Sequence, residues 1–408
     1  MTPLPADVIA TIKATAPAVA AHRGALIARM YELMFAAEPE VRELFNPAHM
    51  TPGGQIGALA EAVAAYAANI DRLEVLGPAV ERIAQKHVAL GVRPDQYPVV
   101  GRHLLQAIRD VFGAAATPEV ITAWAAAYGL LADIFIERER AIEAAQAAAP
   151  GGWAGLRDFR VDRKVPESSI ITSFYMVPAD GGPLPDFHPG QYVTVCSDGP
   201  ATAGARRNYS LSDRPGTGYF RIAVKREPAA ADAHPQGLVS NDMHARVGRG
   251  DIVRLAPPAG DFFLAEPLVR PVVLASGGVG QTVMMSMLAH LAHRGSDFPV
   301  HFIHAATHSV VHAFRGEVKA LCAGRPNFTS HVRYWKPTPD CVPGRDYDST
   351  GQVDADFVRS FASTLDCDFY LCGPKPFMRS LYHGLTTAGV PADRIRFEFF
   401  GPAADITA

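Results

Sequence analysis

The spacing of apolar residues changes once along this chain, and that change constrains the fold more than any other feature. Up to about residue 149, apolar residues recur every three or four positions, as in Leu59, Val63 and Tyr66. This period places them on one face of an α-helix. The pattern ends at Pro150, Gly151 and Gly152, a turn-forming sequence that also suits a domain hinge. The first part of the chain is therefore predicted to be an all-α domain of six or more helices.

Two different β patterns follow. Short β-rich runs separated by turn residues occupy residues 157–264, which indicates a small antiparallel β-barrel. From residue 271 onward, buried strands alternate with helices, which is typical of a parallel α/β domain. We therefore expect a multidomain chain with an all-α domain at residues 1–149, a barrel at residues 150–266 and an α/β domain at residues 267–408.

Composition excludes several kinds of partner. The 408 residues include 38 Lys and Arg against 41 Asp and Glu, and this balance gives no electrostatic reason to bind nucleic acid. The five cysteines form no CxxC pair or Cys/His cluster, so we expect neither disulfides nor zinc, and a cytoplasmic location. The N-terminus lacks the apolar core of a signal peptide, and glycines interrupt the uncharged run at residues 271–289. No membrane insertion is expected.

Three polar residues fall where the helical pattern predicts apolar neighbours. His87 lies on the apolar face of the helix predicted near residues 77–90, and Glu139 lies in the apolar stripe of the last helix. A buried carboxylate needs a donor, and Tyr97 and His87 could each supply one. A histidine that binds iron through Nε2 is commonly oriented by an acceptor at Nδ1. The alternative is that these residues belong to separate, ordinary polar networks in the core.

The β-containing part carries two motifs that suit cofactor binding. In RRNYSLSD (residues 206–213), an extended strand would place Arg207 and Tyr209 on one face and Ser210 on the other. SGGVGQT (residues 276–282) follows a buried strand and precedes an amphipathic helix, where backbone amides could meet a phosphate. Because Val283 stands where a third glycine would complete a Rossmann fingerprint, this motif alone is weak support for dinucleotide binding.

Several helical segments resemble the globin domain of the flavohaemoglobins. The segment ERIAQKHVALGVRPDQYPVVGRHLL (residues 81–105) is similar to the proximal side of that domain, and RMYELMF (residues 29–35) and ELFNPAHM (residues 43–50) are similar to its distal side. The resemblance implies a haem b whose iron is bound by His87, with Tyr97 and Glu139 behind it. On the other face it implies a distal Tyr31, with Gln55 and Leu59 at the start of the covering helix and Phe45 packed on the haem.

The remaining motifs resemble the FAD and nicotinamide domains of the ferredoxin–NADP reductase superfamily. They are PGQYV (residues 189–193), RRNYSLSD, GLVSN (residues 237–241), SGGVGQT, YLCGPKPFM (residues 370–378) and FEFFGP (residues 397–402). The resemblance implies that FAD and NADH or NADPH are bound by Tyr192, Arg207, Asn208, Tyr209, Ser210, Ser240, Asn241, Gly278, Val279, Gly280, Gln281, Thr282, Val283, Cys372, Gly373, Pro374, Glu398, Phe399, Phe400, Gly401 and Pro402. Lys86 and Glu398 match positions near the junction of flavin and haem. Departures from the family are Val283 in place of a proline, a loop at residues 228–235, and Asp242.

The resemblance implies a nitric oxide dioxygenase, in which NAD(P)H reduces FAD, FAD reduces haem iron, and nitric oxide and oxygen become nitrate. Three alternatives remain open at this point. The chain could be a haem-based sensor of oxygen or nitric oxide, a peroxide or quinone reductase, or a lipid-binding protein with an apolar ligand over Leu59. A complete set of flavin and nicotinamide motifs argues against a pure sensor, because binding a gas needs no electron supply. We expect a monomer whose partners are small molecules.

Overall fold

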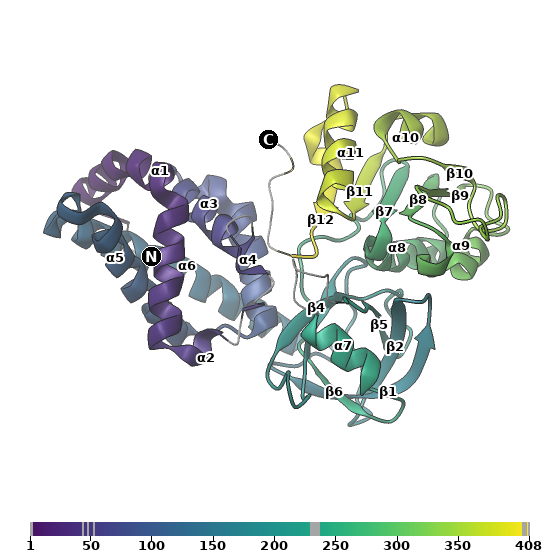
Figure 1. Cartoon of the computed structure of the whole chain (residues 1–408), viewed down its shortest axis with the longest axis horizontal. Helices are drawn as coiled ribbons and strands as arrows, with labels where there is room; N and C mark the ends of the chain where they lie inside the picture. Colours follow the sequence, from purple (N-terminus) through teal and green to yellow (C-terminus); the bar gives the residue numbers. More distant parts are fainter. Residues whose placement is uncertain are drawn as a thin grey trace. The chain divides into compact units, whose positions relative to one another are not determined.

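The computed structural model describes residues 3–42, 45–46, 49–51, 54–228, 237–401 and 406. The chain divides into two compact units (Figure 1). Met1–Ala148 makes up nearly all of the first unit, and Ala149–Ala203 together with Arg207–Phe400 makes up nearly all of the second. The predicted fold class is confirmed, since the first unit is helical and the second contains both predicted kinds of sheet.

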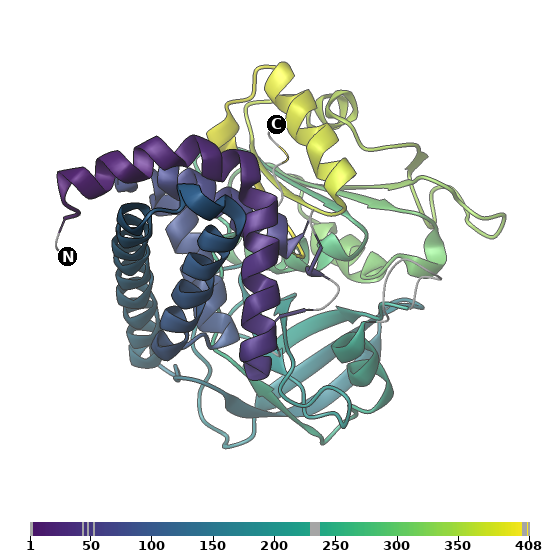
Figure 2. The same ribbon diagram turned by 60° about the vertical axis from the view of Figure 1, so that its left-hand side comes forward.

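The first unit is built from helices of very different lengths. They are α1 (Ala6–Ala37), α2 (Pro39–Arg42), α3 (Gln55–Ala68), α4 (Gly77–Leu90), α5 (Tyr97–Phe112) and α6 (Pro118–Ala148), with short 3-10 turns η2 (Leu73–Leu76), η3 (Pro94–Gln96) and η4 (Gly113–Ala115). Pro17 lies inside α1 and supplies no backbone donor, and Figure 2 shows α1 changing direction along its length. Side chains from α1, α3, α5 and α6 share one apolar core.

Helix α4 has clear signals at both ends. Pro78 occupies the first turn, where the missing N–H costs nothing, and Gly91 ends the helix with a φ of 69°. The Gly91 and Val92 amides then donate to carbonyls of the last turn. These two signals set the helix bounds, and they place His87 in its final turn.

Helix α6 is long and apolar enough to cross a membrane when only length and composition are considered. Core helices of globular proteins pass the same test. Here Trp124, Ala127 and Phe135 of α6 are buried against other helices of the unit. The helix also carries Glu139, which is bonded to two side chains of that unit. We therefore interpret α6 as a core helix.

The second unit begins with a closed antiparallel sheet. Its strands are β1 (Arg157–Pro166), β2 (Ile171–Pro178), β3 (Tyr192–Cys196), β4 (Arg206–Ser210), β5 (Phe220–Lys225) and β6 (Ile252–Leu255), in the order β4-β3-β6-β1-β2-β5. A bridge between Leu211 and Ile222 connects the β4 and β5 edges, so the sheet closes into a barrel. Helix α7 (Leu238–Ala245) follows β5.

The rest of the second unit is a parallel sheet of order β10-β9-β8-β7-β11-β12. Its elements are β7 (Val272–Gly277), η5 (Gly278–Gly280), α8 (Gln281–Arg294), β8 (Val300–Ala306), η6 (Ser309–Val311), α9 (Arg315–Cys322), β9 (Phe328–Tyr334), β10 (Ser349–Thr350), α10 (Ala355–Ala362), β11 (Asp368–Cys372), α11 (Lys375–Thr387), η7 (Ala392–Arg394) and β12 (Ile395–Glu398). Helices α8 and α9 share one core with the sheet, and α10 and α11 share another, so both faces are covered (Figure 1).

A buried ion pair ties the barrel to the parallel sheet. Arg221 on β5 is 3% exposed, and its guanidinium donates to both carboxylate oxygens of Glu317 on α9, at 2.8 and 2.9 Å. The Ser286 hydroxyl on α8 donates to the Asp213 carbonyl at 2.9 Å. These contacts join the barrel and the α/β sheet into one compact unit.

Candidate functional site

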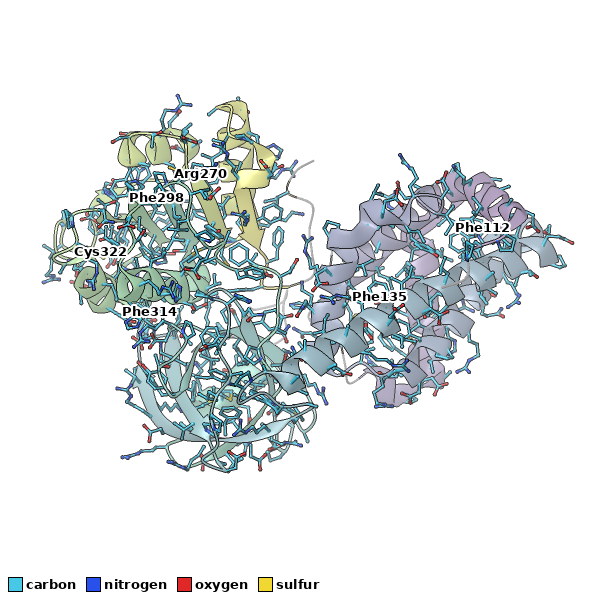
Figure 3. All side chains as sticks on the ribbon, turned by 180° about the vertical axis from the view of Figure 1, so that it is seen from behind. Phe112, Phe135, Arg270, Phe298, Phe314 and Cys322 are labelled. Atoms are coloured by element: carbon cyan, nitrogen blue, oxygen red, sulfur yellow. The ribbon has the colours of Figure 1, made fainter. Side chains whose placement is uncertain are left out.

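The structure brings His87, Tyr97 and Glu139 together in the first unit. Nδ1 of His87 lies 2.7 Å from Oε1 of Glu139, and the Tyr97 hydroxyl lies 2.5 Å from the same oxygen. His87 Nδ1 is also 3.0 Å from the Tyr97 hydroxyl. The three residues come from α4, α5 and α6, and the separate networks considered from the sequence are not what the structure contains. The ring of Phe135, labelled in Figure 3, packs against both His87 and Tyr97.

This geometry determines which ring nitrogen of His87 donates to Glu139. Glu139 is 5% exposed, and a carboxylate only accepts hydrogen bonds, so both neighbours must donate to it. Burial and the Glu139 carboxylate raise the pKa of Tyr97, which keeps its proton available for this bond. His87 therefore donates to Glu139 through Nδ1, which leaves Nε2 as the ring nitrogen that is not used in this contact. Such an imidazole is oriented and made more electron-donating, as in metal-binding histidines with a carboxylate behind them.

The residues expected on the distal side also lie together. Tyr31 on α1 is 4% exposed and hydrogen-bonds the side chain of Gln55, the first residue of α3. Its ring meets Phe45 edge-on and Phe35 at a tilt, each with centroids 5.4 Å apart. Leu59, one turn into α3, packs against the same core. Burial raises the pKa of Tyr31 to about 12, so its hydroxyl remains a neutral donor at physiological pH.

Strand β4 has the extended conformation predicted for it. The Asn208 side chain accepts a hydrogen bond from Thr194 at 2.8 Å, which fixes β4 against β3. Burial lowers the pKa of Arg207 and raises that of Tyr209, and the two side chains interact electrostatically. Ser210, on the alternate side, is buried. A cation and an aromatic ring thus lie together on the strand, a combination that suits a phosphate and a planar ring.

Tyr192 has an unsatisfied hydroxyl. It is 7% exposed, and its oxygen is buried without a hydrogen-bond partner among the described residues. Burial raises its pKa well above the usual value, and the Glu398 and Asp261 carboxylates add to that rise. A buried hydroxyl is seldom left unpaired, so this tyrosine fits a site where a ligand supplies the partner.

Ser240 and Asn241 anchor the start of α7. The Ser240 hydroxyl donates to the Gly237 carbonyl and accepts from the Glu227 backbone amide. The side-chain amide of Asn241 donates to the carbonyls of Gly237 and Glu227. Asp242 accepts from Ser197 and Arg246, so this departure from the family is accommodated by two polar partners. The predicted loop at residues 228–235 lies outside the described residues beyond Pro228.

The two glycine-containing turns of the parallel sheet are packed against each other. Strands β7 and β11 are neighbours, so the turns that follow them meet at the same edge. A Cβ on Gly280 would lie 2.2 Å from the Cys372 carbonyl oxygen, and one on Gly373 would lie 3.0 Å from the Gly277 nitrogen. Gly278 has a φ of 55°, which side chains other than glycine rarely adopt. Only glycines allow the two turns to approach this closely. The backbone amides at the start of α8 can then bind a phosphate.

Other residues assigned to this site are buried supports. Gln281, Thr282 and Val283 are at most 2% exposed, and the Thr282 hydroxyl donates to the Val279 carbonyl. All three can offer a phosphate their backbone N–H groups, and the side-chain amide of Gln281 has no hydrogen-bond partner among the described residues. Cys372 is 1% exposed, and burial raises the pKa of its thiol, so the thiol stays protonated. Beside it, Pro374 precedes α11 and lies close to Gly277.

The C-terminal segment presents an aromatic side chain to solvent. Glu398 ends β12, Phe399 packs against Phe397 with ring centroids 5.7 Å apart, and Phe400 is 48% exposed. Gly401 follows, and Pro402 lies outside the described residues. Lys86 is half-buried on α4, directly before His87. Its predicted place near the junction of the cofactors stays a prediction.

Sequence reasoning missed a buried polar cluster beneath the glycine turn. The Ser276 hydroxyl lies 2.9 Å from Nδ1 of His304, and the His304 ring packs at a tilt against that of His312, with ring centroids 4.9 Å apart. His312 Nδ1 lies 3.0 Å from the Tyr334 hydroxyl. Burial lowers the pKa of both histidines, that of His312 to about 4, so both are neutral. The signal in the sequence was the presence of two histidines, His301 and His304, inside an otherwise apolar strand.

Two family models match the chain. The Globin model matches residues 28–135, and the Oxidoreductase NAD-binding domain model matches residues 274–382. The first range contains His87 and Tyr97, and the second contains both glycine turns. A globin-type unit joined to a flavin and nicotinamide reductase unit defines the class of flavohaem oxidoreductases.

The comparisons over the whole chain identify the family. The chain is 47% identical to the Flavohemoprotein of Rhodopirellula baltica over 98% of both chains. It is 50% identical to the Flavohemoprotein of Bordetella bronchiseptica over 97% of this chain and 98% of that one. The chain therefore belongs to the flavohemoprotein family.

Solved structures agree with this assignment. The flavohemoglobin from Malassezia yamatoensis, determined with bound FAD and heme, matches with a TM-score of 0.83 at 25% identity, over 98% of this chain and all of that one. The FAD/NAD binding domain of nitric oxide dioxygenase from Vibrio cholerae matches with a TM-score of 0.54 at 37% identity, over 60% of this chain and 99% of that one.

Proposed function

We propose that this chain is an NAD(P)H-dependent nitric oxide dioxygenase that uses haem b and FAD. The observation that carries the proposal is the histidine held by a buried carboxylate, His87 with Glu139 and Tyr97, in a chain that also contains a complete reductase unit. Relatives named Flavohemoprotein share 42–50% identity over nearly the whole chain. The named dioxygenase from Vibrio cholerae matches the reductase unit.

The residues present fit both groups. His87 would bind the haem iron through Nε2, because Nδ1 is already bonded to Glu139. FAD would be held by the Tyr192 hydroxyl, which has no partner among the described residues, by the Arg207–Tyr209 pair and by the anchored start of α7. When bound, these groups supply electron transfer from a two-electron hydride donor to a one-electron iron, together with the oxygen chemistry.

The protein itself provides orientation, donors and exclusion of water. Glu139 and Tyr97 hold the His87 ring in one tautomer and one direction. On the other side, Tyr31 offers a neutral O–H donor in an aromatic surrounding made by Phe35 and Phe45. The amides at the start of α8 would bind the diphosphate of NAD(P)H.

The alternative functions explain less of the chain. A sensor of oxygen or nitric oxide would need no reductase, whereas the NAD-binding model matches residues 274–382. A quinone reductase would need no carboxylate-held histidine, whereas a peroxide reductase could use one, and nitrate formation separates it from a dioxygenase. We further propose that the chain works as a monomer in the cytoplasm, a compartment that would keep its five cysteines reduced. A lipid or another apolar ligand over Leu59 remains a prediction for the distal side.

The proposal is tested with His87→Ala and a matched control, His22→Ala, which alters an exposed histidine on α1. His87→Ala should lose stoichiometric haem and nitrate formation, yet retain FAD and electron transfer from NADH to an artificial acceptor. The control should behave as the wild type. A His87→Ala protein with a wild-type haem spectrum would overturn the ligand assignment. Wild-type protein that holds haem and FAD but forms no nitrate would overturn the proposed activity.

A further inference from the structure

The order of the parallel strands predicts where each end of a nicotinamide dinucleotide must lie. Ligands of such sheets bind beyond the carboxyl ends of the strands, and the phosphate-binding turn here follows β7. On one side of β7 come β11 and β12, and the Glu398 carboxylate at the end of β12 interacts electrostatically with Tyr192 of the barrel. The nicotinamide must face the flavin, so it belongs on this side. The adenosine end must then cross β8 toward β9.

The ends of β8 and β9 are held next to each other. The Trp335 amide donates to the Ala306 carbonyl at 3.0 Å, and the Lys336 amide donates to the Thr307 carbonyl at 3.1 Å. The parallel pairing of β8 and β9 therefore continues past the ends of both strands. Adjacent strands are about 4.8 Å apart, so β9 ends roughly 10 Å from the phosphate turn, two strands away.

At this place the chain exposes a large aromatic ring. Trp335 is 57% exposed, whereas the other two tryptophans, Trp124 and Trp153, are buried or half-buried. The ammonium of Lys336 lies 4.3 Å from the centroid of the Trp335 ring. Within the part of the chain that the structure describes, Lys336 forms no salt bridge, so the indole is its charge-stabilising neighbour. An exposed indole is a suitable stacking surface for a base, since every base has a π-face.

We propose that Trp335 is the adenine-stacking residue for the nicotinamide dinucleotide, and that Lys336 binds a ribose 2′-phosphate, so that the chain accepts NADPH as well as NADH. This inference rests on the proposed function for the identity of the electron donor. Adenine takes the place of the ammonium on the indole, and the freed ammonium meets the phosphate. Thr307, exposed after β8, is uncharged at a point where an acidic residue would repel that phosphate.

Trp335→Ala tests the stacking. It should raise KM about tenfold for both NADH and NADPH in flavin reduction, the size of one base-stacking contact, and leave kcat unchanged. Calorimetry should show ADP-ribose binding weakened by a similar factor, while inhibition by nicotinamide mononucleotide stays the same. Trp335→Phe should restore most of the affinity. Val269→Ala changes an exposed residue just before β7, at the amino ends of the parallel strands and so away from the proposed site, and serves as the control.

Lys336→Gln tests the phosphate contact. It should raise KM for NADPH about tenfold and leave KM for NADH within twofold, and it should weaken binding of adenosine 2′,5′-bisphosphate but not of ADP. Equal effects on both coenzymes would overturn the role of Lys336, and unchanged ADP-ribose affinity in Trp335→Ala would overturn that of Trp335. Neither readout involves nitric oxide. If the wild-type protein forms no nitrate but the two variants show these shifts, the proposed function is refuted and this inference stands.

Discussion

Replacing Glu139 by glutamine keeps the size of the side chain and removes its charge, so the packing around it should barely change. Two hydrogen bonds depend on that charge, from His87 at 2.7 Å and from Tyr97 at 2.5 Å. Bonds to a charged group contribute about 1.5–3 kcal/mol, and neutral ones about 0.5–1.5 kcal/mol. The exchange therefore weakens the two bonds by about 2 kcal/mol in total.

The consequence is measurable as loss of haem. Changing the acceptor behind a metal-binding histidine typically lowers metal affinity by about 10- to 100-fold. Transfer of haem from Glu139→Gln to an excess of a haem-scavenging apoprotein should therefore be faster than from the wild type by about that factor. FAD content should not change. The matched control is Glu143→Gln, an exposed residue one turn further along α6.

Two results would refute this reasoning. Haem loss at the wild-type rate would mean that the Glu139 contact does not act on the iron ligand. Equal acceleration in Glu143→Gln would mean that the effect comes from the general charge of α6 and not from the hydrogen bonds to His87 and Tyr97.

Three further predictions concern other contacts. Tyr31→Phe removes a hydroxyl but not the ring, so oxygen release should become about 10- to 100-fold faster while flavin reduction by NADH is unchanged; slower flavin reduction with unchanged oxygen release would contradict the distal assignment. Burial lowers the pKa of His312 from 6.5 to about 4. The neutral ring therefore contributes its full stabilisation of the folded state above pH 6.5, and this stabilisation is lost as the pH falls toward 4. Unfolding of the second unit should lose up to about 3 kcal/mol over that range, and a His312→Gln variant with an equal pH dependence would contradict this. Arg221→Met leaves Glu317 without its buried partner and should destabilise the second unit by about 2–3 kcal/mol, seen as FAD release at a lower temperature; an unchanged release temperature would show that the ion pair adds nothing.

Local signals in the sequence were enough to predict the helix that carries His87. Gly77 and Gly91 mark its two ends, and the apolar period places the histidine on the inner face. Glu139 in an apolar stripe could be predicted to need donors, because an unpaired buried carboxylate is costly. That His87 and Tyr97 are those donors depends on how three helices pack, which no local signal determines.

Contacts between residues of distant strands could not be predicted from the sequence for a similar reason. Ser276 and His304 are directly paired residues of β7 and β8, but that register is set only when the strands assemble. Arg221 and Glu317 are 96 residues apart and meet only because the barrel docks on α9. The exposure of Trp335 follows from its place just past the end of β9, which a sequence pattern cannot locate to one residue.

The stoichiometry of the reaction tests the central claim most directly. A hydride carries two electrons and each conversion of nitric oxide and oxygen to nitrate takes one, so one NADH should support two nitrates. The measurement is NADH oxidised, nitric oxide consumed and nitrate formed by the wild-type holoenzyme in air. We predict two nitrates for each NADH, with all the nitric oxide recovered as nitrate. NADH oxidation that leaves nitric oxide unconsumed, or that converts it to products other than nitrate, would contradict the account.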